Sequence, residues 1–269
     1  WSDIALRDTR RAALDTGEAV WTQCHAFSAL LAVSPRSVLP LLEQRLSAVR
    51  RGEPATRQSA QIFLRRHMAR ELAGRLAEHG YLLAPLRDLS SDPDGAVRQA
   101  VAQAIARMPT EHAAGFATRL RLDRDPQVRA QLLADPGPLA ARIGSEAVLG
   151  HVLRLLGRDS DEFVLRTTID AARLLGDWCL AEAPERLDVT RHALQSALTD
   201  LRQRVDKPRI RRWAGEAYEY LWLLGDEEAR ALAAELMSAA ARLKEGERAR
   251  VPALGPAVVA DPDKVGRVM

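Results

Sequence analysis

The sequence contains few of the residues on which many enzymes and membrane proteins depend. Of its 269 residues only 4% are aromatic and two are cysteine, and only three of the 39 basic residues are lysine, the others being arginine. No stretch approaches the roughly 18 apolar residues of a membrane span. The N-terminal residues are charged and lack the apolar run of a signal peptide. We therefore expect no membrane partner.

Cysteine and histidine have no spacing that suits a disulfide or a metal. Cys24 and Cys179 lie far apart, and none of the six histidines lies three or four residues from another, as two ligands on one helix would. We predict no metal site and no cofactor. Two unpaired thiols fit a reducing compartment, and we expect a bacterial cytoplasmic protein. The excess of arginine indicates either nucleic-acid contact or the codon usage of a GC-rich genome with solvated helix faces.

The motifs of common enzyme classes are also missing. No glycine-rich phosphate loop follows a strand pattern, and no Gly-x-Ser-x-Gly elbow occurs. We therefore predict no catalytic residue and expect a protein that is not an enzyme.

What the sequence contains instead is helix-forming residues arranged in repeats. Valine, isoleucine and threonine never alternate over the length of a strand, which predicts an all-α fold. Six times an aliphatic residue or threonine follows an acidic residue and opens a helix-forming run, at intervals of 31 to 46 residues. Such intervals are typical of two-helix repeats. These anchor residues are Val20, Thr56, Val97, Val128, Val164 and Ile210.

Glycine and proline separate the expected helices. We expect Val97, Val128, Val164 and Ile210 to fill the space between the two helices of a pair, and Gly176 to end its helix. A helical-repeat domain is predicted over 1–245, with its last helix at 229–243. Over 246–269, prolines and glycines remove any helical period, which predicts a tail or linker. Because the chain begins with Trp1, we expect it to be a piece of a larger protein or assembly.

The sharpest copies of the repeat carry a short motif. They read Asp92-Pro93-Asp94-Gly95-Ala96-Val97-Arg98 and Asp125-Pro126-Gln127-Val128-Arg129. A helix pair whose second helix opens in this way resembles the HEAT repeat family, over about residues 18–224. The resemblance implies a right-handed α-solenoid of about six antiparallel helix pairs. In that family loop aspartates and these arginines form ladders between repeats, which would pair Asp92, Asp125 and Asp161 with Arg98, Arg129 and Arg166.

A row of polar residues recurs on successive second helices. Stacked repeats would align this row into one strip, on or beside the concave face where such solenoids bind partners. A strip that is merely solvated is the alternative. The row consists of Arg57, Gln58, Gln61, Arg98, Gln99, Gln103, Arg129 and Gln131.

A second candidate site lies near the C-terminal end of the predicted repeats. Arg211, Gly215, Tyr218 and Trp222 are spaced by four, three and four residues, which places them on one stripe of a helix. Arginine beside aromatic rings suits a peptide, a nucleobase or a cation. Packing of this stripe against the last helix or the tail is the alternative.

These features predict an interaction scaffold that binds a protein or peptide. The alternative is a nucleic-acid-binding or DNA-repair protein, because alkylpurine DNA glycosylases of similar architecture hold DNA on a basic concave surface. The candidates for that chemistry are Asp170, Asp177, Trp178 and Trp213, although the tryptophans could equally fill the core. With 39 basic and 36 acidic residues, duplex DNA is expected to bind only weakly. Arginines clustered on the concave face would favour nucleic acid, and arginines neutralised by aspartate and glutamate would favour the scaffold.

Overall fold

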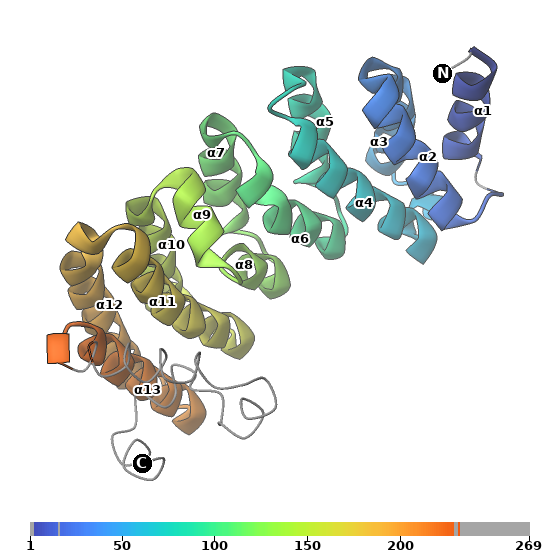
Figure 1. The fold of residues 1–269 in the computed structure, drawn as a ribbon. Helices are drawn as coiled ribbons and strands as arrows, with labels where there is room; N and C mark the ends of the chain where they lie inside the picture. The colour runs from blue at the N-terminus through green and yellow to red at the C-terminus, as the bar shows by residue number, and fades with distance from the viewer. Residues whose placement is uncertain (1–2, 16, 229–230, 232–269) are drawn as a thin grey trace, which may run out of the picture. The chain divides into compact units, whose positions relative to one another are not determined.

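A computed structural model of the chain describes residues 3–15, 17–228 and 231. Within these residues it contains thirteen α-helices, four short 3-10 helices and no strand (Figure 1). The predicted all-α fold is confirmed. Apart from residue 231, the helix expected over 229–243 lies outside the described residues, as does the tail expected over 246–269.

The chain divides into two compact units, Trp1–Leu132 and Leu133–Met269. Unit 1 contains α1 (Asp3–Leu14), α2 (Val20–Val33), η1 (Pro35–Val38), α3 (Leu39–Arg50), η2 (Pro54–Arg57), α4 (Ser59–Arg75), η3 (Gly80–Leu82), α5 (Leu83–Leu89), α6 (Gly95–Ala104), η4 (Ile105–Arg107), α7 (Thr110–Leu120) and α8 (Pro126–Leu132). These elements form four successive helix pairs, of which α1 and α2 are the first.

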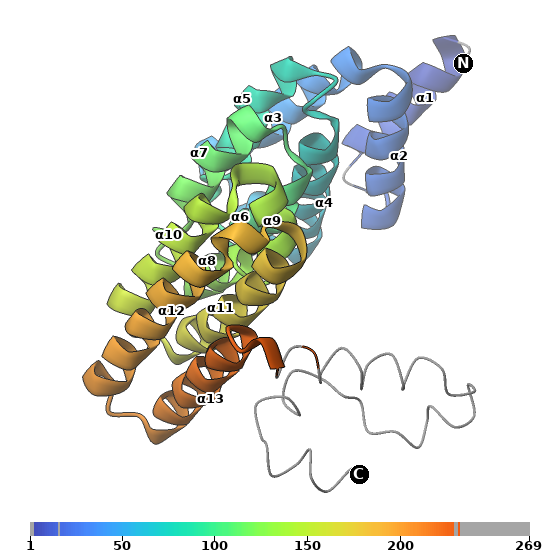
Figure 2. The same cartoon turned by 60° about the vertical axis from the view of Figure 1, so that its left-hand side comes forward.

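Unit 1 has two layers of helices. Helices α2, α4, α6 and α8 pack side by side in chain order, and α3, α5 and α7 lie on one side of them (Figures 1 and 2). We call the first set the second-helix layer, because each member is the second helix of its pair. The other set is the first-helix layer.

Unit 2 contains two further pairs and one single helix. Its elements are α9 (Pro136–Ile143), α10 (Ser145–Arg158), α11 (Glu162–Glu182), α12 (Pro184–Arg204) and α13 (Pro208–Leu224). Helix α10 packs against α12 and α11 packs against α13, while α9 packs against α10 and α11. The described residues thus hold the six expected helix pairs, and α9 is an additional helix that the sequence did not predict.

The four anchor residues expected in the core lie there. Val97, Val128, Val164 and Ile210 are completely buried. The two fainter anchors, Val20 and Thr56, are only partly buried. Their motifs therefore mark the wrong positions in the first two pairs.

Gly176 does not end its helix, contrary to the prediction, because α11 continues to Glu182. The glycine instead permits a close approach to α13. A Cβ atom at this position would lie 2.8 Å from Leu221 Cδ2 and 2.9 Å from Leu224 Cδ1. Both distances are too short for ordinary packing.

We expect Gly176→Ala to lower the free energy of unfolding by about 1 kcal/mol, because overpacking of about 1–3 kcal/mol outweighs a gain of about 1 kcal/mol in helix propensity. Gly150, exposed within α10, is the matched control, since a Cβ there would meet nothing within 4 Å. Gly150→Ala should raise stability by up to about 1 kcal/mol. Thermal melting of both variants checks the pair, and a higher midpoint for Gly176→Ala would contradict the tight contact.

Candidate functional site

Two buried ion pairs connect successive repeats of unit 1. Arg65 of α4 donates from Nε and Nη2 to the carboxylate of Asp92, at 2.7 and 3.3 Å, in the loop before α6. Arg98 of α6 binds Asp123, in the loop before α8, in the same way at 2.7 and 2.9 Å. All four side chains are less than a tenth exposed. We call these two pairs the arginine–aspartate ladder.

The aspartates of the ladder also shape their loops. Asp92 and Asp123 each accept the backbone N–H of the aspartate two residues later, at 2.9 Å. That second aspartate accepts an N–H at the start of the following helix, as Asp94 does from Ala96 at 2.8 Å. The motif is thus Asp-x-Asp, in which the first carboxylate holds an arginine and the second caps a helix.

Electrostatics keeps the second ladder pair charged. Burial acts to raise the pKa of Asp123, but hydrogen bonds from Arg98 and from the Asp125 N–H outweigh it and lower that pKa overall. The same hydrogen bond raises the pKa of Arg98. The pair is therefore ionic over the physiological range.

The ladder differs in register from the one that the resemblance implied. Arg98 binds Asp123 rather than the side chain of Asp92, and touches Asp92 only through its carbonyl oxygen, at 2.6 Å. Asp125 and Asp161 accept N–H groups at the starts of α8 and α11. The predicted Asp92–Arg98 pair was wrong because each ladder arginine binds the first aspartate of the loop that follows it in the chain and not the loop before its own helix.

Arg166 contacts an aromatic ring, and Arg129 contacts backbone carbonyl oxygens. The Arg166 guanidinium lies over the Trp213 ring, 5.0 Å from its centroid. Arg129 donates from Nη1 to the carbonyl oxygens of Asp123 and Arg124, at 2.8 and 3.3 Å.

The predicted polar row contains a similar error in α4. Arg57 and Gln58 are exposed in and just after η2, before α4 begins, and Gln61 accepts a hydrogen bond from Arg45 at 2.7 Å. The true counterpart of Val97-Arg98 is Leu64-Arg65, a pair 33 residues earlier in the sequence. That interval, close to the 31 residues between Val97 and Val128, was the signal that sequence reasoning missed.

With the register corrected, Arg66 and Arg70 occupy the positions in α4 that Gln99 and Gln103 occupy in α6. Arg70 Nη2 donates to Gln103 Oε1 at 3.0 Å. Gln99 Nε2 donates to Gln131 Oε1 at 3.2 Å, which connects α6 to α8. The structure therefore places Gln99 beside Gln131 and Gln103 beside Arg70. Arg98 leaves the row because it is buried in the ladder.

Positive charge gathers at one end of this row. Burial lowers the pKa of Arg70, and the positive charges of Arg66 and Arg107 lower it further. Among the residues of α2, α4, α6 and α8, Glu71 is the only acidic one. In the part of the chain that the structure describes, no ion pair involves Arg66, Arg70 or Arg107. We call these three residues the arginine cluster.

An exposed aromatic pair lies on the same layer. Trp21 of α2 is 62% exposed, and its ring lies edge-on to that of Phe63 of α4, with centroids 4.9 Å apart. Phe63, Arg66 and Arg70 lie on one stripe of α4, because they are three and seven residues apart. The aromatic pair and the arginine cluster are therefore neighbours.

The C-terminal stripe is only partly available. Arg211 donates to the carbonyl oxygen of Val205 at 2.6 Å and to Asp206 Oδ1 at 2.9 Å, which fixes it at the start of α13. Tyr218 is half-buried, whereas Trp222 is 54% exposed. A site at Tyr218 and Trp222 remains a proposal.

The candidates for DNA repair are largely engaged elsewhere. Asp177 accepts a hydrogen bond from the Tyr220 hydroxyl, and burial raises the pKa of its carboxyl against the effects of Tyr220 and Arg173. Trp178 packs against Gly137, because a Cβ atom added to Gly137 would lie 3.1 Å from the Trp178 ring. The fourth candidate, Asp170, is exposed. No reactive arrangement follows from these contacts.

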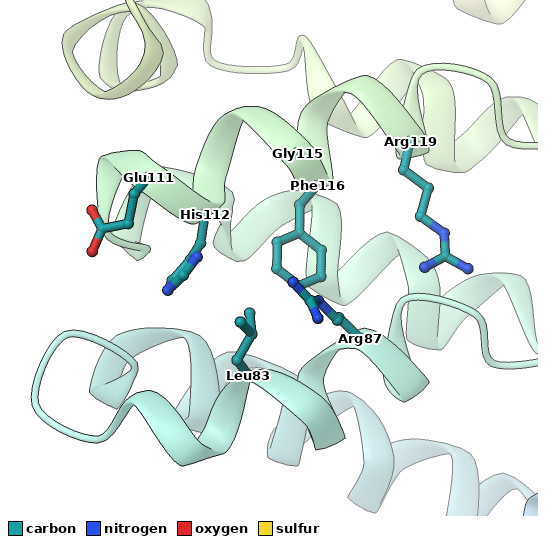
Figure 3. A pocket seen from close by; sticks show the side chains of 7 residues that line it. All are labelled: Leu83, Arg87, Glu111, His112, Gly115, Phe116 and Arg119. Atoms are coloured by element: carbon teal, nitrogen blue, oxygen red, sulfur yellow. The ribbon is translucent and has the colours of Figure 1, made fainter.

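A shallow pocket opens in the first-helix layer, between α5 and α7 (Figure 3). Arg87 and Arg119 approach it from the two helices, and Arg119 also donates to the Ser91 hydroxyl. Of the residues that line the pocket, only Phe116 is buried. The pocket therefore lacks a buried polar group that would fix a ligand.

The described residues lack both a metal site and a membrane-crossing helix. No group of three or more histidine, cysteine, aspartate or glutamate residues there is placed to hold a metal ion. Among the helices of that part of the chain, none has both the length and the apolar character that a membrane crossing requires.

Helix pairs joined by a ladder through their loops define an α-helical repeat protein. The family model described as HEAT repeats matches residues 53–135, which include both ladder pairs. Over this segment the chain is similar to HEAT repeats. No curated protein matches the chain. No solved structure matches it either.

Proposed function

We propose that this protein is a non-enzymatic interaction module that binds a segment of another protein across the second-helix layer of unit 1. HEAT repeats are commonly protein-interaction scaffolds. The observation that carries the proposal is the row of uncharged glutamines, Gln99, Gln103 and Gln131, that extends from a small group of arginines. Arg65 and Arg98 are buried against carboxylates, whereas the arginine cluster has no carboxylate partner among the described residues. The unpaired thiols of Cys24 and Cys179 support a reducing compartment, the bacterial cytoplasm.

The test compares two triple variants of equal charge. Arg66, Arg70 and Arg107 are changed to glutamine in one, and Arg36, Arg87 and Arg119 of the first-helix side in the other. Each protein is immobilised, exposed to bacterial lysate and cross-linked, and the captured proteins are quantified by mass spectrometry. We expect specific capture to fall by about tenfold or more in the cluster variant only, as loss of an interface hot spot would cause. Equal capture by both variants would refute the proposed face.

Nucleic-acid binding is the second candidate function, and the arginine cluster itself is the observation that favours it. Three neighbouring guanidinium groups beside an exposed tryptophan also suit a single-stranded nucleic acid. Against this, the remaining row of the layer is neutral glutamine, and a strand of phosphates needs cations along its whole track. The protein scaffold is therefore placed first.

A further inference from the structure

The second-helix layer also indicates what kind of partner segment it would bind. Resting on the proposed function, we infer that the segment is an extended acidic peptide with one large apolar residue. Its carboxylates bind the arginine cluster, and its apolar side chain packs on Trp21 and Phe63.

Charge complementarity supports the acidic part of the peptide. Arg66, Arg70 and Arg107 lie close enough to repel one another, and a carboxylate between them would replace repulsion with charge-assisted hydrogen bonds. The Nε of Arg66 is buried and has no hydrogen-bond partner among the described residues. Glu71 lies near His67, and its negative charge would repel an acidic peptide there. The acidic residues of the peptide are therefore expected on the side of the cluster away from His67.

The glutamines support a peptide over a nucleic acid. An amide side chain both donates and accepts hydrogen bonds, as the peptide backbone does. Gln99, Gln103 and Gln131 extend from the cluster across α6 and α8 and carry no charge. The arginine cluster thus suits a few acidic residues of the peptide. The glutamines beyond it suit the uncharged peptide backbone that follows.

The aromatic pair supports the apolar residue and sets its spacing. Trp21 offers an exposed ring held in place by Phe63, and large exposed apolar side chains are typical of binding sites. Phe63 and Arg70 are seven residues apart in α4, or about 10 Å along the helix. An extended peptide covers that distance with about three residues.

A peptide selection tests the inference. Random peptides of about twelve residues, displayed on phage, are selected on the immobilised full chain at about 150 mM salt. We expect enriched sequences to place at least two aspartates or glutamates about three residues from a tryptophan, phenylalanine or leucine. A fluorescent copy of the most enriched peptide should bind about tenfold more weakly to Arg66→Gln/Arg70→Gln and to Trp21→Ala. Binding to the control Arg87→Gln/Arg119→Gln should be unchanged, and circular dichroism checks that each variant is folded.

The outcomes separate the inference from the proposed function. Neutral or basic peptides whose binding is lost in Arg66→Gln/Arg70→Gln would overturn the acidic partner but leave the face in place. Peptides that bind equally to all variants would count against both. A labelled oligothymidine of similar length that binds more tightly than the best peptide would overturn the inference in favour of a nucleic acid.

Discussion

Asp123→Asn is expected to lower the free energy of unfolding by about 3–5 kcal/mol, because it leaves the charge of Arg98 buried without a counter-ion. Only 7% of the Arg98 side chain and 8% of the Asp123 side chain are exposed, so water cannot replace the lost carboxylate. Chemical denaturation at neutral pH, with an unchanged dependence on denaturant, measures the loss.

Two control variants are compared with Asp123→Asn. Glu43→Gln removes a carboxylate from the exposed Arg50–Glu43 pair and should cost no more than about 1 kcal/mol. Replacing both members of the buried pair, as in Arg98→Met with Asp123→Leu, should recover most of the loss because no lone charge remains. If Asp123→Asn were as stable as Glu43→Gln, the ladder would have no structural role.

The second large effect is expected at the corrected anchor of α4. Leu64 is completely buried, so Leu64→Ala should lower the free energy of unfolding by about 2–5 kcal/mol. Thr56, the anchor that the sequence suggested, is only partly buried and its hydroxyl donates to the Glu53 carbonyl. Thr56→Ala should therefore cost about 1 kcal/mol. Equilibrium unfolding of both variants decides the register, and a larger loss for Thr56→Ala would restore the original alignment.

The fold could be predicted because its signals are local. Buried valines at Val97, Val128 and Val164 recur at helical positions, and aspartates before the helices cap them through contacts two or three residues away. Such contacts depend on the chain nearby and not on how repeats stack. The prediction of paired helices consequently held for both units.

The site could be predicted only in part because it depends on register between repeats. Arg65 and Asp92 are 27 residues apart, and Arg98 and Asp123 are 25 apart, so each pair forms only when neighbouring repeats are aligned. The segment Glu53-Pro54-Ala55-Thr56-Arg57 imitates the repeat motif, but its proline begins a 3-10 turn before α4. Because of that displacement, the sequence pattern placed Arg57, Gln58 and Gln61 in the row where the structure has Arg66 and Arg70.

The ladder also constrains how this chain can change length. Its two links are alike, since each joins an arginine of one second helix to the first aspartate of the next Asp-x-Asp loop. Removing or adding one whole repeat would leave every arginine opposite an equivalent aspartate. Turns between the helices can differ in length, since the two links span 27 and 25 residues and both form. A change that moved α4 out of register with the loop before α6 would instead leave Arg65 and Asp92 buried without their partners. We therefore expect unit 1 to keep its ladder when it gains or loses a complete helix pair.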